Sequence, residues 1–174
     1  RSVVVNLGLI RTLRFPRATL PLSATVGQTM AFVPALTVMA AVVAAHGIWP
    51  HPRWLLIPAL LVLQSAFSLG AGFLAARYNY AYRDLENLLP FVFRFAFYVS
   101  GVLYSVDHYI DSTLGRAVFL ANPFYCFVTV WRWVLAGTPA AGEVWVATGV
   151  WSTATLVVGF ALFRARETTY GGTG

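Results

Sequence analysis

Charged side chains that could act on a ligand are few in this chain, and the most unusual of them is Arg94. It lies about two turns inside the apolar run of residues 88–104, among the aromatic side chains of Phe91, Phe95 and Tyr98. An arginine at such depth costs roughly 2.5–3.5 kcal/mol on insertion scales. Its guanidinium must therefore reach the headgroups, pair with an acid, or face a wet cavity where it could bind an anionic group. All three readings stay open from the sequence.

A second group of polar side chains follows in Asp107-His108-Tyr109-Ile110-Asp111. These residues could be drawn as an acid/base pair or as metal ligands. The segment falls in an expected outer loop, where Asp and His usually serve to keep the loop in water, and we favour that reading. His46 and His51 have no carboxylate or cysteine nearby, which argues against a metal site there.

No Gly-rich phosphate-binding loop with a lysine occurs in the chain, which has no lysine at all. The sequence therefore predicts no catalytic residues, no metal and no cofactor in this chain.

The elements that position these side chains are membrane helices. Hydrophobic residues make up 59% of the 174, charged residues only 10%, and the mean hydropathy is +0.70. A soluble domain has about 25% charged residues, so most of this surface is suited to lipid. The 12 basic residues are all arginines that stand singly at the ends of apolar runs, which argues against nucleic-acid binding. The single Cys126 excludes an intrachain disulfide.

Four apolar runs are long enough to predict membrane-spanning helices, at residues 21–45, 54–76, 88–104 and 144–163. In the second run Ser68, Gly72 and Ala76 stand four apart, a spacing that favours close packing against another helix. A polar corner at residues 77–87, which carries Arg77 and Arg83, joins the second and third runs. Arginines near helix ends mark the cytoplasmic side.

The segment between Arg116 and Arg132 decides the predicted topology. It holds only 15 uncharged residues and is broken by Asn122-Pro123, so it is short for a span. If it dips into the membrane and returns, Arg164 and Arg166 stay inside. The inner arginines are then Arg1, Arg11, Arg14, Arg17, Arg77, Arg83, Arg164 and Arg166, against Arg53, Arg116 and Arg132 outside. We therefore predict a re-entrant outer helical hairpin over residues 112–136, buried in protein or lining a cavity.

A short amphipathic helix is predicted at residues 6–17. Leu9, Ile10 and Leu13 fall on one face, while Arg11 and Arg14 fall on another. The helix is too short to span, so it lies at the cytoplasmic surface. It either rests in the headgroups or docks on a cytoplasmic partner, and the sequence leaves both readings open.

Three motifs in this frame carry a family resemblance. Leu9-Ile10-Arg11, Phe15-Pro16-Arg17 and Leu20-Pro21-Leu22 together resemble the entry to the third span of ABC-type bacterial polysaccharide export permeases. These are the membrane subunits that export O-antigen, teichoic acid or galactan on lipid carriers. Tyr82-Arg83-Asp84-Leu85 resembles their cytoplasmic Tyr-Arg-Asp corner. Asn122-Pro123-Phe124 with Arg132 resembles their Asn-Pro…Arg outer segment, which forms paired gate helices. Ser100-Gly101 departs from the family's usual Ser-Pro after the fifth span.

The resemblance covers nearly the whole chain, in order and spacing. It implies an all-α transmembrane permease domain over residues 1–174: four spans, the outer hairpin and a cytoplasmic coupling helix, belonging to a six-span permease whose first two spans are missing. It further implies a multi-pass protein of the cell membrane, surrounded by membrane lipids and paired with a second copy of itself.

The partners implied are separate ATPase subunits, which use the ATP, and a polyprenyl-diphosphate-linked glycan that the complex exports. The chain itself is then not an enzyme. The expected substrate or channel residues are Arg94, Phe91, Phe95, Tyr98 and Trp131. Coupling to the ATPase is expected at Leu9, Ile10, Leu13, Arg83 and Asp84, and the gate at Asn122, Pro123 and Arg132.

Two alternative functions remain. One is a related ABC exporter of drugs or lipids, which would share the fold but lack the sugar-facing aromatic side chains. The other is a membrane-embedded glycan-transferring enzyme that uses Asp107 or Asp111. An ATPase gene among neighbouring glycosyltransferase genes would favour glycan export. Changing both aspartates to asparagine would abolish turnover by an enzyme but leave an exporter mostly active.

Overall fold

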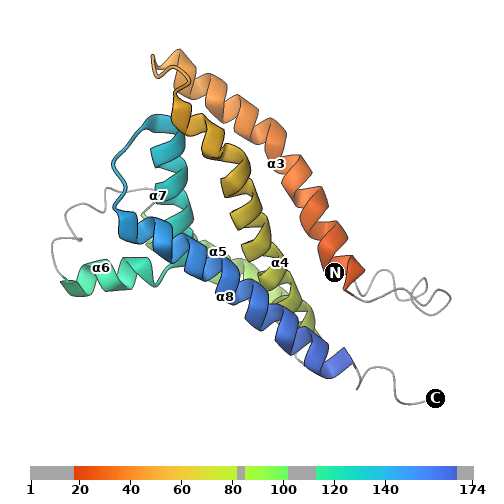
Figure 1. Ribbon diagram of the computed structural model, residues 1–174. Coiled ribbons are helices and arrows are strands. Elements are labelled where there is room, and N and C mark those ends of the chain that lie inside the picture. Colours follow the sequence, from red (N-terminus) through yellow and green to blue (C-terminus); the bar gives the residue numbers. More distant parts are fainter. Residues whose placement is uncertain (1–17, 82–84, 102–112, 168–174) are drawn as a thin grey trace, which may run out of the picture.

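The computed structural model describes residues 18–81, 85–101 and 113–167, and the elements in these ranges are all helical (Figure 1). In chain order they are α3 (Thr19–Ala45), the 3-10 helix η1 (Pro52–Leu56), α4 (Ile57–Ala81), α5 (Leu85–Val99), α6 (Thr113–Leu120), α7 (Pro123–Ala136) and α8 (Gly142–Glu167). The predicted all-α class is thus confirmed for the described residues.

Three helical stretches are long and apolar enough to cross a membrane: Thr19–Ala45, Pro52–Tyr78 and Gly142–Ala165. They correspond to the first, second and last predicted spans. The third predicted span is shorter than expected, because α5 ends at Val99 and not near Tyr104. Gly101, with φ of 69°, lies in the turn that follows. At 1.5 Å per residue α5 is about 22 Å long, less than a hydrocarbon core of roughly 30 Å. That α5 crosses the membrane remains a prediction.

The polar corner is smaller than the sequence predicted. Residues 77–81 continue α4 by more than a turn, and α5 already begins at Leu85. These five residues include no glycine or proline, so nothing in them stops the helix once it leaves the apolar zone. Arg77 belongs to this extension and donates from Nη1 to the carbonyl of Leu162 in α8, at 2.8 Å.

The closest helix pair is α4 with α8. A Cβ added at Gly70 would fall on the backbone of Thr155, and one added at Gly159 would fall on the carbonyl of Gly70. The two main chains therefore touch at this crossing, which only glycine permits. Beside this crossing, the ring of Phe73 in α4 meets the ring of Phe160 in α8, with centroids 5.7 Å apart. The predicted small-residue stripe lies elsewhere on α4: a Cβ at Gly72 would be in ordinary contact with Pro21 of α3, at 3.8 Å, while Ser68 is exposed.

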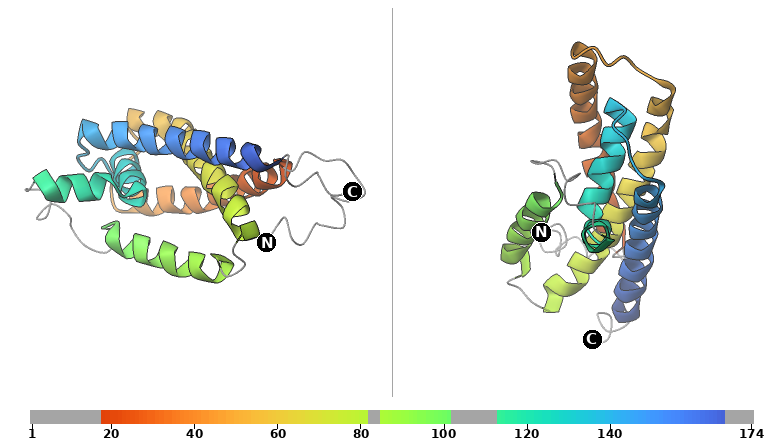
Figure 2. Two further views of the ribbon diagram at one scale, coloured as in Figure 1. Left: turned by 90° about the horizontal axis from the view of Figure 1, so that it is seen from below. Right: turned by 90° about the vertical axis from the view of Figure 1, so that its left-hand side faces the viewer.

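Helices α4 and α8 run in the same direction. At one end Arg53, just before α4, donates to the carbonyl of Gly137, shortly before α8 begins. At the other end lies the bond from Arg77 to Leu162. In Figures 1 and 2, the start of α3 and the end of α8 lie at this second end. The chain must therefore return across the molecule between α4 and α8, as the predicted order of elements requires.

Candidate functional site

The predicted ligand-binding side chains of α5 share one face of that helix. Phe91, Phe95 and Tyr98 stand at spacings of four and three, so they form a single stripe. They are 67%, 72% and 54% exposed. Arg94 lies next to the stripe, is also exposed, and pairs with no carboxylate among the described residues. The stripe is an aromatic surface with one cation at its edge.

The other side of α5 is held by α7. The rings of Phe93 and Phe124 meet edge to face, with centroids 5.9 Å apart. Asn122 donates from Nδ2 to the carbonyl of Ala96 at 3.5 Å, and Arg132 donates from Nη1 to the carbonyl of Gly101 at 3.3 Å. Two of the predicted gate residues thus contact the last part of α5 and the turn after it.

The third gate residue, Pro123, helps to begin α7. Asn122 is the N-cap, and its Oδ1 accepts from the Phe124 backbone N–H at 3.0 Å. Proline suits the following position because its missing N–H would have no partner in the helix. Gly137 ends α7 in the left-handed conformation, with φ of 74°. The break that the sequence predicted at Asn122-Pro123 is therefore the turn between α6 and α7.

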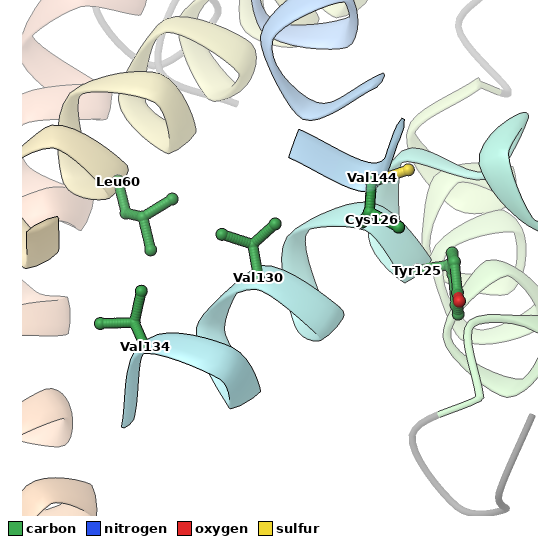
Figure 3. Packing of buried hydrophobic residues seen from close by; sticks show 6 residues of the cluster. All are labelled: Leu60, Tyr125, Cys126, Val130, Val134 and Val144. Carbon is green, nitrogen blue, oxygen red and sulfur yellow. The ribbon is translucent and has the colours of Figure 1, made fainter. Parts of the chain in front are cut away.

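Helix α7 rests on the buried core of the molecule. Val130 and Val134 are fully buried and point toward Leu60 of α4, while Cys126 lies beside Val144 of α8 (Figure 3). Tyr125 completes the cluster near the α6 end. Beyond this cluster, Trp151 of α8 donates to the carbonyl of Leu120 at 3.0 Å. The core therefore forms where α4, α7 and α8 meet, and α5 lies outside it.

Trp131, the fifth predicted substrate residue, is not part of the α5 stripe. Its Nε1–H donates to Oε1 of Gln64 in α4 at 2.8 Å, and its ring meets Phe32 of α3 edge to face at 5.8 Å. Sequence reasoning assigned no role to Gln64. The available signal was that it is the one amide side chain in the apolar run 54–76.

A second contact that the sequence did not reveal lies two residues further along α7, at Trp133. The Arg53 guanidinium sits over the Trp133 ring, 4.7 Å from its centroid, and Trp133 meets Trp145 edge to face at 5.3 Å. With its bond to Gly137, Arg53 places a cation at the C-terminus of α7, where the helix dipole favours positive charge.

The predicted coupling residues Leu9, Ile10, Leu13, Arg83 and Asp84 lie outside the described residues, as do Asp107 and Asp111. Within the ranges that are described, no group of three His, Cys, Asp or Glu side chains could hold a metal ion.

Comparison with known proteins gives three similar chains, all with the name O-antigen export system permease protein RfbA. One, from Myxococcus xanthus, is 27% identical over 124 residues, which is 71% of this chain and 48% of that protein. Two from Klebsiella pneumoniae are 26% and 25% identical over 132 residues, 75% of this chain and 50% of theirs. The chain spans about half the length of the curated relatives it matches. No family model matches it, and no solved structure matches it.

The sequence motifs, the three apolar helices and these relatives agree with one another. The chain is a multi-pass protein of the cell membrane, and the resemblance to ABC-type O-antigen export permeases that its motifs predicted is confirmed by these relatives.

Proposed function

We propose that this chain is part of the membrane subunit of an ABC transporter that exports a polysaccharide linked to a polyprenyl diphosphate. The observation that carries the proposal is the similarity, over about three quarters of the chain, to permeases named for O-antigen export. The exposed stripe of α5 supports it, because aromatic faces can stack on sugar rings while Arg94 can bind a diphosphate.

In the proposed mechanism, substrate contact and gating belong to different helices. The α5 stripe contacts the glycan and its carrier, and α7, with α6, forms the re-entrant outer gate. Asn122 and Arg132 connect α7 to α5, since Asn122 donates to a carbonyl near the end of α5 and Arg132 donates to a carbonyl in the turn that follows. A displacement of α7 would therefore move the part of α5 nearest the gate.

Energy for export comes from a separate ATPase subunit. The permease is not itself an enzyme and acts as a homodimer. We place the docking of the ATPase on the amphipathic helix at residues 6–17, whose apolar face is too small for firm anchoring in lipid but fits a groove on another protein. Arg83 and Asp84 in the cytoplasmic corner complete the coupling surface.

Copurification tests the proposal. The protein, isolated from the membranes of its native host under mild conditions, should retain an ABC ATPase and a glycan attached to a polyprenyl diphosphate. Changing Leu9 and Leu13 together to Asp should abolish ATPase retention and export while leaving insertion intact, because these two positions lie on no span. Arg14→Asp alters the net charge by the same amount on the other face of the helix, so it serves as the matched control.

A preparation that retains no ATPase, or one that carries a free lipid or drug-like molecule in place of a glycan, would contradict the proposed function. If the wild-type protein retains an ATPase and the double aspartate variant also retains it and exports normally, the docking surface lies at the corner around Arg83 and not on the helix.

A further inference from the structure

The contact between Trp131 and Gln64 joins α7 to α4 by a directional bond. Its donor–acceptor distance of 2.8 Å lies inside the range of a well-formed N–H···O bond. Gln64 lies in the second turn of α4, about 18 Å along the helical stretch that begins at Pro52, so the bond lies within the apolar zone. Both groups would be poorly solvated there without each other.

Most of the remaining contact between α7 and α4 is apolar. Val130 and Val134 pack on Leu60, and Phe127 packs on Phe67 with ring centroids 5.4 Å apart. Apolar contacts of this kind are not directional, and packed helices can exchange one register for another that differs by a turn, or 5.4 Å. A shift of that size would carry Asn122 and Arg132 away from the carbonyls of Ala96 and Gly101.

We propose that Gln64 is a positioning residue, which sets the register of α7 through Trp131 and thereby the place of the α5 stripe. The inference rests on the proposed function, since the roles of α7 and α5 in export come from there. Gln64 accepts the Trp131 hydrogen bond in one register of α7 against α4 and in no other. Trp131 accordingly positions α7 and does not contact the exported glycan.

The chain contains its own reporter of α7. Cys126 is the single cysteine in the 174 residues, is 0% exposed, and stands five residues before Trp131, a spacing that puts the two side chains on different faces of α7. The experiment measures the rate at which N-ethylmaleimide labels Cys126 in membranes of the native host, together with export in the same cells. Gln64→Leu removes the acceptor and should raise the labelling rate about three- to tenfold, the range expected for one interhelical hydrogen bond in a membrane. Export should fall by a similar factor.

Three further variants distinguish a positioning role of Gln64 from a general loosening of the helix packing. Gln64→Glu keeps a carbonyl acceptor at the same reach, because the apolar zone favours the neutral carboxyl, so labelling and export should stay closer to wild type than in Gln64→Leu. Gln64→Asn keeps the amide one methylene too short and should behave like Gln64→Leu even if the leucine variant is poorly produced. Trp131→Phe added to Gln64→Leu should cause no further change, since both remove the same bond.

Ser65→Ala is the matched control. It removes another interhelical bond at the next residue of α4, the 2.9 Å contact with Thr29 of α3, and should leave Cys126 labelling unchanged. Equal labelling in wild type, Gln64→Leu and Gln64→Asn would overturn the inference even if export occurs. A labelling response in a protein that exports no glycan would instead support the positioning role and contradict the proposed function.

Discussion

At the scale of single residues, Arg94 is the most unusual side chain, because it is a charged residue in an apolar helix. It is exposed beside the stripe of Phe91, Phe95 and Tyr98, and none of the described carboxylates pairs with it. A lone guanidinium on an aromatic helix face is suited to a phosphate oxygen, because its planar fork can donate two parallel hydrogen bonds.

We expect Arg94→Ala to lower export about ten- to a hundredfold, the effect of losing one charge-assisted hydrogen bond to the proposed diphosphate. Insertion into the membrane and assembly of the proposed dimer should not change. Arg94→Lys should restore only part of the activity, since an ammonium lacks the planar fork. The measurements are glycan export and substrate-stimulated ATPase activity. Arg116→Ala is the control, because Arg116 is also exposed and forms only a 3.7 Å surface ion pair with Glu143. Full export by Arg94→Ala would mean that Arg94 merely reaches the headgroups.

At the scale of elements, the sequence predicted lengths better than contacts. The spans that became α3, α4 and α8 follow from uninterrupted apolar runs, a property of each segment alone. The end of α4 was missed because helical hydrogen bonds continue past the apolar zone through residues 77–81. The α5 stripe followed from spacing within one helix. The partner of Trp131 and the crossing at Gly70 could not be predicted, because each depends on which face a second helix presents.

The crossing of α4 and α8 gives a prediction about stability. Gly159→Ala should destabilise the protein by about 1–3 kcal/mol, since the added methyl would fall on the Gly70 carbonyl and force the helices apart. Gly149 lies on the same helix and has nothing within 4 Å of an added Cβ. Gly149→Ala should therefore be neutral or stabilise by up to about 1 kcal/mol through helix propensity. The thermal unfolding midpoint in detergent compares the two, and equal midpoints would show that the crossing is looser than described.

At the scale of the whole molecule, the order of the elements fixes which ends share a membrane face. The bonds from Arg53 to Gly137 and from Arg77 to Leu162 place the starts of α4 and α8 together and their ends together. The predicted concentration of arginines on the inner side would place both of these helix ends in the cytoplasm. In that predicted topology, the segment between α4 and α8, which contains α5, α6 and α7, brings the chain back to the outer face.

Cysteine accessibility tests this topology. In a Cys126→Ala background, N79C and R166C should react with an impermeant thiol reagent only after the cytoplasmic face is opened. H108C should react from outside in intact cells. Labelling of R166C from outside would mean that the segment 112–136 is a complete span, and would remove the basis for the gate.

The contact of main chains at Gly70 and Gly159 also limits how this protein can recover from mutation. A clash between two side chains is often relieved by a smaller residue on the partner helix. Here the partner atoms are the backbone of Thr155 and the carbonyl of Gly70, and glycine is already the smallest residue. No substitution at either glycine can therefore suppress a defect at the other. In a genetic selection for revertants of Gly159→Ala, the survivors should be true reversions, or changes that strengthen the α4–α8 pair elsewhere along its length.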